Sequence, residues 1–286
     1  MKRENSDIFF TVQQQPVVGF DSGVEAANKK MLTRYSKTKE LYLGIVNVNY
    51  RVVENEEILF PLQSAMQDFF PNTDTIQIKD TLLKNGAVCW TQYIFPEISS
   101  FVETNSNHKT EFCLRIILKN TFDRSGAITM FMGDIDKFCA NGMISGTFDL
   151  TKQRHTKRFD PDVFTRALAE TYPRYEEQIK KYQNYAEIDV NKDKVKELLR
   201  VLTITPEETE GKNLLYNKLY DQFEEEVYHR GSNLFALTSA MTSYGSHFTE
   251  RFPHKKTSNE GTLLNRQEKV KRWLSSPAWQ NFLEAA

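Results

Sequence analysis

The chain has 286 residues, with 37 lysines and arginines against 38 aspartates and glutamates, which gives a formal net charge of −1. This near-neutral balance excludes a globally basic nucleic-acid binder, so any contact with nucleic acid must come from a local basic patch. Hydrophobic residues make up 40% and charged residues 26% of the chain, which is ordinary for a soluble globular protein.

Residues 1–30 mix turn-forming residues with isolated apolar ones, which predicts an irregular N-terminal arm. Five cations follow within a short span, namely Lys29, Lys30, Arg34, Lys37 and Lys39. They indicate either a solvated surface segment or an arm that contributes to a phosphate-binding surface.

An α+β pattern follows the arm. Residues 41–53 are strand-like, and apolar residues recur at helical spacing over 58–70, with Pro61 expected in the first turn of that helix. Residues 75–97 predict a hairpin that turns at Asn85-Gly86.

A second hairpin is predicted by residues 111–135, after a polar loop at 99–110. Its first strand alternates apolar and polar residues with period two, and Gly126 is free to take a positive φ in the turn. We therefore expect residues 31–158 to form an α+β core with an antiparallel sheet and a crossing helix.

Residues 159–286 carry several segments with apolar residues at helical spacing. Thr205 and Pro206 are typical of a helix start, and Gly231 of a helix end. These residues predict a helical region that continues from the α+β core as one fold.

The basic run TKQRHTKR, residues 151–158, is the sharpest functional signal. It contains no acid and carries four cations and a histidine: Lys152, Arg154, His155, Lys157 and Arg158. Such charges repel one another unless solvent or phosphate neutralises them, and each phosphate contact makes the affinity for nucleic acid depend on salt. The run indicates either a solvated linker between the two halves or a nucleic-acid contact.

Neighbouring residues of the two hairpins are positioned to extend this basic patch. Arg115, Lys119 and Arg124 add cations. Trp90 and Tyr93 lie on opposite faces of one predicted strand, so we expect one of them to be exposed and to stack on bases, which is worth about 1–3 kcal/mol per base.

Two alternative functions have weaker signals. Asp123, Asp134 and Asp136 would serve a metal-dependent nuclease, although the last two also fit a strand end that caps a following helix. The acidic stretch Glu224-Glu225-Glu226 and surface aromatics would serve an inhibitor that binds a host protein.

Other chemistry has little support in the sequence. Neither GxxxxGK nor GxGxxG occurs, which argues against nucleotide hydrolysis, and GxSxG is absent too. Cys89, Cys113 and Cys139 are far apart, lack zinc-type spacing and have apolar neighbours, so we expect reduced, buried thiols and no cofactor. Nothing orients Cys139 and His155 as a nucleophile and base. No signal peptide or membrane-spanning run is present, which predicts a cytoplasmic protein.

Several segments resemble, in sequence and order, the phage/plasmid-like protein family known as domain of unknown function 932: YLGIVNVNYRVVENEEILF, LKNTFDRSG, FCANGMI, RHT and NLFALTSAMTSYGSHF. The resemblance runs from about Lys30 to about Phe252, and the family's usual Asp-Gly-Ser turn reads Asp123-Arg124-Ser125-Gly126 here. It implies a phage or mobile-element origin, hence the cytoplasm of a host cell, without implying an activity. The order of predicted elements is also similar to the β-β-β-α core of single-strand annealing proteins, which assemble rings around a basic groove.

We therefore expect a non-catalytic phage protein that binds or anneals single-stranded DNA during recombination or replication. The same resemblance to annealing proteins implies a homo-oligomer. Further partners would be host or phage replication and recombination proteins, without a membrane contact.

Overall fold

The computed structural model describes residues 1–3, 7–70, 72–136, 151–203, 214–247, 266 and 269–285. The chain divides into two compact units: unit 1 comprises residues 1–97, 115–132 and 149–172, and unit 2 comprises residues 98–114, 133–148 and 173–286. Because the chain passes between the units several times, they are not consecutive parts of the sequence. This differs from the predicted division into an arm, a core to residue 158 and a helical region.

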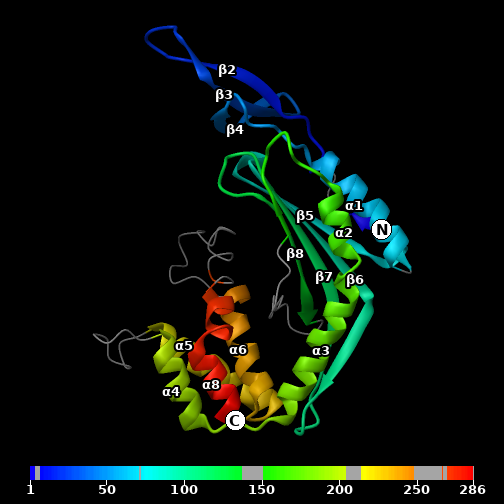
Figure 1. Ribbon diagram of the computed structural model, residues 1–286, viewed down its shortest axis with the longest axis vertical. Helices are drawn as coiled ribbons and strands as arrows, with labels where there is room; N and C mark the ends of the chain where they lie inside the picture. Colours follow the sequence, from blue (N-terminus) through cyan, green and yellow to red (C-terminus); the bar gives the residue numbers. More distant parts are fainter. Residues whose placement is uncertain are drawn as a thin grey trace. The chain divides into compact units, whose positions relative to one another are not determined.

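A six-stranded sheet in the order β1-β5-β6-β7-β8-β9 confirms the predicted α+β class (Figure 1). Its strands are β1 (Lys2–Arg3), β5 (Gln77–Leu83), β6 (Val88–Glu103), β7 (Lys109–Thr121), β8 (Ile128–Asp136) and β9 (Thr151–Gln153). The β5–β6 pair is antiparallel, as expected, and β9, which the sequence did not predict, pairs antiparallel with β8. β1 pairs with β5 in parallel and makes the sheet mixed.

Both predicted hairpins are present, but only one turns as expected. The β5–β6 connection is a short 3-10 turn, η2 (Lys84–Gly86), in which Asn85 has φ 62° and Gly86 has φ 98°. In the β7–β8 turn the left-handed residue is Arg124, with φ 63°, and not Gly126. The Asp123 carboxylate accepts a hydrogen bond of 2.9 Å from the backbone N–H of Ser125, which stabilises this bend around Arg124.

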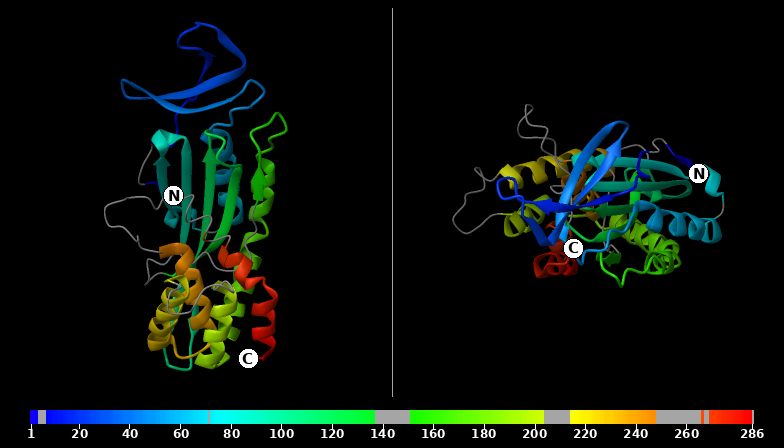
Figure 2. Two further views of the ribbon diagram at one scale, coloured as in Figure 1. Left: turned by 90° about the vertical axis from the view of Figure 1, so that its left-hand side faces the viewer. Right: turned by 90° about the horizontal axis from the view of Figure 1, so that it is seen from above.

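Among the described residues of the first thirty, fourteen lie in strands, so the predicted irregular arm contains regular structure. β2 (Gln13–Val18), β3 (Glu25–Ser36) and β4 (Lys39–Asn47) form a three-stranded antiparallel sheet. Figure 2 shows it beyond the ends of the large sheet's strands in unit 1. Most side chains of β2 are exposed or half-buried, so the strand lacks the apolar alternation by which strands are found in a sequence.

In unit 1, helices α1 (Asn55–Phe69) and α2 (Asp162–Leu168) cover one face of the large sheet (Figure 1). A capping box between Glu54 and Glu57 begins α1. The helix buries an apolar stripe against the sheet, namely Ile58, Leu59, Leu62 and Met66. Pro61 lies inside α1, further from its start than predicted.

The second half of the chain is helical, as predicted. Its helices are α3 (Thr171–Glu187), α4 (Lys192–Thr203), α5 (Leu214–Arg230), α6 (Leu234–His247) and α8 (Pro277–Ala285), with a further helical turn at 269–274. Among the described residues, no helix is both long and apolar enough to cross a membrane. The predicted helix start at Thr205-Pro206 and the thiol of Cys139 lie outside the described residues.

The core of unit 2 joins α3 and α6 to the strand residue Phe112. The Phe112 ring lies 5.4 Å from the ring of Tyr182 and 6.0 Å from that of Phe235, measured between centroids. The Tyr175 hydroxyl donates a hydrogen bond of 2.9 Å to the backbone carbonyl of Phe112. These contacts fix the N-terminal part of β7 to the helices of unit 2.

Substitution of Gly86 tests whether the tight β5–β6 turn requires a glycine. Its φ of +98° suits glycine, and a Cβ there would lie 2.7 Å from Nε of Arg34, which donates a hydrogen bond to the Asn85 carbonyl. We expect Gly86→Ala to lower the free energy of unfolding by about 1–2 kcal/mol in urea denaturation, because the left-handed backbone and the displaced arginine both disfavour a side chain. Gly126→Ala is the control, since its Cβ would make an ordinary 3.5 Å contact with Nζ of Lys119. Equal losses in both variants would contradict this account of the turn.

Candidate nucleic-acid interface

The basic run forms a closed loop, residues 153–160, which we call the basic loop. It begins at the edge of the sheet, where Gln153 of β9 pairs with Ile128 of β8. The backbone N–H of Asp160 donates a hydrogen bond of 3.0 Å to Oε1 of Gln153, and Nε2 of Gln153 donates to the Asp160 carbonyl. The loop is therefore closed at its base by one side chain.

Two buried side chains hold the basic loop against the rest of unit 1. His155 stacks on Tyr50 with ring centroids 4.8 Å apart, and its carbonyl accepts a hydrogen bond of 3.3 Å from the backbone N–H of Arg51. Phe159 lies under the guanidinium of Arg51 at 5.4 Å. Because these contacts fix the backbone, the direction of the remaining side chains is fixed as well.

The cations of this segment point to solvent. Lys152, Arg154, Lys157 and Arg158 are all exposed, and none of them makes an ion pair with a residue that the structure describes. The acid that closes the loop, Asp160, pairs instead with Arg166 at 3.2 Å. Four positive charges are thus presented together without a carboxylate partner.

Arg124, which the sequence suggested as an extension of the basic patch, lies on the neighbouring β7–β8 turn. The Tyr50 hydroxyl donates a hydrogen bond of 3.0 Å to the carbonyl of Thr121, and the ring of Phe122 lies 6.0 Å from that of His155. The β7–β8 turn therefore packs beside the basic loop, and Arg124 is exposed on that turn.

His155 is buried, unlike the cations that the sequence grouped with it as nucleic-acid contacts. Only 6% of the residue is exposed, and its Nδ1 accepts a hydrogen bond of 3.4 Å from the Val53 backbone. Burial lowers the pKa of His155 from 6.5 to about 4, with a smaller contribution from the positive charge of Arg51. The imidazole is therefore a neutral anchor of the loop.

Arg115 and Lys119 are buried as well, although the sequence suggested that they extend the exposed basic patch. They are 7% and 8% exposed, and each interacts with other groups of the chain. Nζ of Lys119 lies 5.8 Å from the centroid of the Trp90 ring. Period-two alternation placed both cations on one strand face, but it could not reveal how closely that face is packed.

Neither Trp90 nor Tyr93 offers a free ring face, so the expectation that one of them is exposed is wrong. Trp90 is 7% exposed and stacks against Phe131 with centroids 6.1 Å apart. Tyr93 is fully buried, and its hydroxyl accepts a hydrogen bond of 2.9 Å from Gln63 of α1. Both rings therefore lie in packed surroundings.

The structure supplies other exposed aromatics, in the β3–β4 hairpin. Residues 35–42, which we call the hairpin tip, expose 57% of Tyr35 and 52% of Tyr42. Lys37 and Lys39 lie between them, are exposed and make no ion pair with described residues. The cations were visible in the sequence, and the tyrosines on either side of them were the signal that would have identified this segment.

The hairpin tip and the basic loop belong to the same end of the large sheet. Arg34, next to the tip, donates a hydrogen bond to the Asn85 carbonyl in the β5–β6 turn. Further along β4, Gly44 passes so close to the β7–β8 turn that a Cβ would lie 2.9 Å from Cα of Asp123. Tyr50, after β4, packs on the basic loop. The β2–β4 sheet therefore lies across the end of the large sheet where these turns are found (Figure 1).

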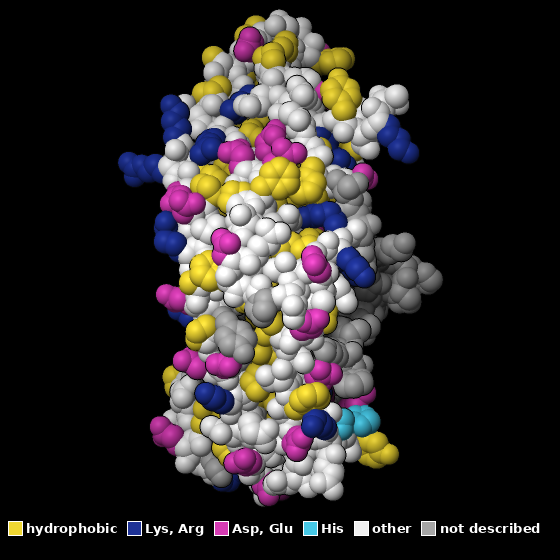
Figure 3. All heavy atoms as spheres, turned by 90° about the vertical axis from the view of Figure 1, so that its right-hand side faces the viewer, with side chains coloured by type: hydrophobic (Ala, Val, Ile, Leu, Met, Phe, Trp, Pro, Cys, Tyr) yellow, Lys and Arg dark blue, Asp and Glu magenta, His cyan; other side chains and the backbone are white. Residues whose placement is uncertain are grey.

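The face of the large sheet that carries α1 differs from the basic loop in its distribution of charge. Among the described residues on the face shown in Figure 3, lysines and arginines are interspersed with aspartates and glutamates, and these residues form no patch of one sign. The face that carries α1 therefore lacks the electrostatic character expected of a surface that follows a nucleic-acid backbone.

The aspartates proposed for a nuclease are placed differently from one another. Asp123 lies in the β7–β8 turn and pairs with Lys84 at 2.7 Å, whereas Asp134 is buried along β8. The side chain of Asp136 lies outside the described residues. Within the part of the chain that the structure describes, no three His, Cys, Asp or Glu residues form a group able to hold a metal ion.

The acidic stretch proposed as an inhibitor contact is only partly exposed. Glu226 is buried and pairs with Arg230 at 3.0 Å, and Glu224 pairs with Lys192 at 2.6 Å. Helical geometry turns consecutive acids to different sides of α5 and leaves Glu225 as the exposed member.

His155 generates a pH prediction. Between about pH 6.5 and 4 the unfolded chain binds a proton at this site and the folded chain does not. The free energy of unfolding therefore decreases as the pH is lowered through this window. The shift corresponds to a loss of at most about 3.4 kcal/mol. We expect His155→Gln to flatten this part of the pH profile of the unfolding free energy, whereas His229→Gln, at an exposed histidine, leaves it steep. Equal slopes for both variants would contradict the assignment.

Comparison with known proteins gives one match. A family model described as a domain of unknown function, DUF932, matches residues 42–272, a range that contains the basic loop and most of both units. No curated protein and no solved structure matches the chain. Since the match covers well over half of the sequence, the chain belongs to the DUF932 family.

Proposed function

We propose that this protein binds single-stranded DNA without sequence preference and promotes annealing, in the recombination or replication of a phage or other mobile element within its host cell. One observation carries the proposal: β9 and the anchored basic loop present Lys152, Arg154, Lys157 and Arg158 to solvent without an acidic partner among the described residues. Chain segments with exposed cations are common, but here the backbone beneath them is fixed by buried anchors.

Phosphates are the ligands that suit these four cations. Each phosphate neutralised by a lysine or arginine releases condensed counterions, which makes log K fall with log salt by about 0.7 per contact on a single strand. Four contacts would give a slope of about −3. Arg124 on the adjacent turn is placed to add a further contact.

Aromatic rings near a phosphate-binding surface favour single strands over duplex. Tyr35 and Tyr42 in the hairpin tip have exposed rings, and Lys37 and Lys39 accompany them. Bases of a single strand can stack on such rings, whereas bases of a duplex are already stacked on one another. The tip therefore replaces Trp90 and Tyr93 in the binding role that the sequence suggested.

Annealing would also require a protein–protein contact, and the β2–β4 sheet is the candidate surface for it. The β2–β4 sheet and the residues next to its strands expose five large aliphatic or aromatic side chains besides the tip tyrosines, namely Val18, Phe20, Val24, Ile45 and Val48. Exposed apolar residues gathered on one small sheet are typical of a surface that meets another protein. We take a second copy of the chain as the first candidate, because annealing brings two bound strands together.

Charge reversal in the basic loop tests the phosphate contacts. We expect Arg154→Glu with Lys157→Glu to weaken binding of a labelled single-stranded oligonucleotide at least about 100-fold at low salt, and to reduce the salt slope by about 1.4. Lys180→Glu with Lys196→Glu makes the same change in net charge at exposed helical positions and should leave the affinity nearly unchanged. Fluorescence anisotropy gives both quantities. Equal affinity of the two double variants would overturn the assignment of the loop.

The hairpin tip is tested separately by removing its rings. Tyr35→Ala and Tyr42→Ala should each weaken single-strand binding by about 1–3 kcal/mol, because a stacked base loses its platform. The salt slope should stay as in the unaltered protein, since no cation is removed. Tyr228→Ala is a matched control, because Tyr228 is 85% exposed on α5. An effect no larger than that of the control would remove the tip from the binding surface.

A further inference from the structure

The turn between β2 and β3 combines exposed apolar side chains with acids. We call this segment, residues 18–25, the acidic turn. Val18, Phe20 and Val24 are exposed in it, and the Phe20 ring is fully accessible to solvent. Asp21 and Glu25 are exposed too, and neither makes an ion pair with a residue that the structure describes. Because residues 17–28 contain no lysine or arginine, the acids lack a cation in this segment.

Hydrogen bonds fix the backbone of the acidic turn. The N–H of Gly19 donates to the Val24 carbonyl at 2.9 Å, and the N–H of Gly23 donates to the Gly19 carbonyl at 3.0 Å. Gly23 has a φ of 62°, which glycine adopts without strain. The Phe20 ring is therefore presented on an ordered turn, so little backbone entropy is lost when a partner binds it.

The acidic turn and the hairpin tip lie at opposite ends of one strand. β3 has 12 residues, Glu25–Ser36, and an extended strand of that length spans about 35–40 Å. The two ends therefore cannot touch each other within one copy of the chain.

In the hairpin tip both tyrosines lie on the same face. Tyr42 pairs with Thr33 and Glu40 pairs with Tyr35, and residues two apart on a strand share a face. Glu40, the acid of the tip, accepts hydrogen bonds from the Gln15 amide and the Thr33 hydroxyl, so it is engaged within the sheet. The two rings and the two lysines of the tip are left to meet a ligand.

The two ends are complementary in their chemistry. The tip presents tyrosine rings beside Lys37 and Lys39, and the acidic turn presents the phenyl ring of Phe20 beside Asp21 and Glu25. Aromatic rings pack favourably in offset or edge-to-face arrangements, and opposite charges across an interface favour and orient the contact. Because one copy cannot close this contact on itself, a second copy is the partner that supplies it.

Other exposed aromatic residues suit the acidic turn less well. Lys109 lies 4.2 Å from the centroid of the Phe101 ring, but it already pairs with Glu103 at 2.8 Å. Phe69 at the end of α1 follows the exposed Asp68, whose charge would repel the acids of the turn. The hairpin tip combines exposed rings with lysines that make no ion pair among the described residues.

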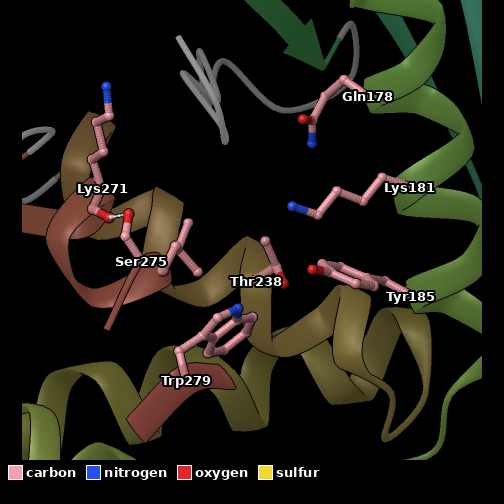
Figure 4. A pocket seen from close by; sticks show the side chains of 8 residues that line it. Gln178, Lys181, Tyr185, Thr238, Lys271, Ser275 and Trp279 are labelled. Carbon is pink, nitrogen blue, oxygen red and sulfur yellow. Dashed lines mark hydrogen bonds between the residues drawn. The ribbon is translucent and has the colours of Figure 1, made fainter. Parts of the chain in front are cut away.

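The pocket in unit 2 that Lys181 and Trp279 help to line is no alternative seat for Phe20 (Figure 4). Its volume is about 60 Å³, whereas a cavity that binds benzene has about 150 Å³. A phenyl ring does not fit this space, so an exposed ring face suits Phe20 better.

We propose that the acidic turn of one copy docks on the hairpin tip of a second copy. Because the two surfaces differ, the contact is head to tail and links copies into a ring or an open chain. Each surface is far smaller than the about 20–30 residues per side of a stable complex, so a single link is weak and depends on protein concentration.

Docking would also regulate strand binding, provided that bases stack on the hairpin tip as the proposed function requires. A docked turn covers Tyr35 and Tyr42, whereas the four cations of the basic run take no part in the contact. A strand on linked copies is then held through its phosphates while its bases are left free to pair. Linked copies would thus favour annealing over tight storage of the strand.

Sedimentation velocity of the full chain without DNA tests the contact. We expect the unaltered protein to associate reversibly at micromolar concentrations in low salt, and to dissociate as sodium chloride is added. Asp21→Lys with Glu25→Lys, and separately Lys37→Glu with Lys39→Glu, should each raise the Kd of association at least about tenfold, because like charges then meet. The control, Glu176→Lys with Glu177→Lys, makes the first change in net charge at exposed positions of α3 and should leave Kd unchanged.

Mixing the two charge-reversed proteins tests whether the two ends meet. The altered turn is then basic and the altered tip acidic, so an equimolar mixture should associate although neither protein does so alone. Phe20→Ser removes the ring without changing the charge and should weaken association several-fold, which supplies a further variant if a reversal fails to fold. The proposal is overturned if the unaltered protein stays monomeric, if both reversals associate as tightly as the control, or if the mixture of folded variants stays monomeric.

Strand binding separates this contact from the proposed function. Asp21→Lys with Glu25→Lys leaves the basic loop and the hairpin tip intact, so it should bind a labelled single strand at least as tightly as the unaltered protein. A protein that binds the strand without associating with itself would overturn the contact alone. One that associates as expected but binds no strand would overturn DNA binding and leave the contact standing.

Discussion

The packing of His155 and Phe159 against Tyr50 and Arg51 is the constraint on which the candidate interface depends. Burial of one imidazole and one phenyl ring fixes a short loop whose other side chains carry like charges that repel one another. Arg51 also pairs with Glu57 in the first turn of α1, so the same residue ties the loop to the helix that covers the sheet. The exposed cations thus rest on the core of unit 1.

Lysine and arginine serve two different purposes in this chain. In unit 1 the cations of the basic loop and the hairpin tip are exposed and lack partners among described residues, which suits a long, flexible polyanion. In unit 2 Arg230 is buried, pairs with Glu226 and donates a hydrogen bond of 2.9 Å to Ser239, so it acts within the core.

Much of the fold could be predicted because its signals are local. Asn85-Gly86 identified a hairpin turn, and helical spacing identified the second half of the chain. Side-chain exposure could not be predicted in the same way, because period-two alternation assigns residues to faces without saying what covers each face. Trp90 and Tyr93 are both buried for that reason, and His155 lies inside a run that otherwise points to solvent. The pocket around Lys181 joins residues far apart in the sequence, which only the folded chain brings together.

The most direct test of the central claim is the salt dependence of single-strand binding by the unaltered protein. Fluorescence anisotropy of a labelled oligonucleotide, with and without magnesium and with duplex as competitor, should show binding that prefers the single strand and leaves the probe intact. The slope of log K against log salt should be about −3, as expected for four phosphate contacts. Absence of binding at low salt, or an affinity insensitive to salt, would contradict the account, and cleavage that requires magnesium would point to a nuclease instead.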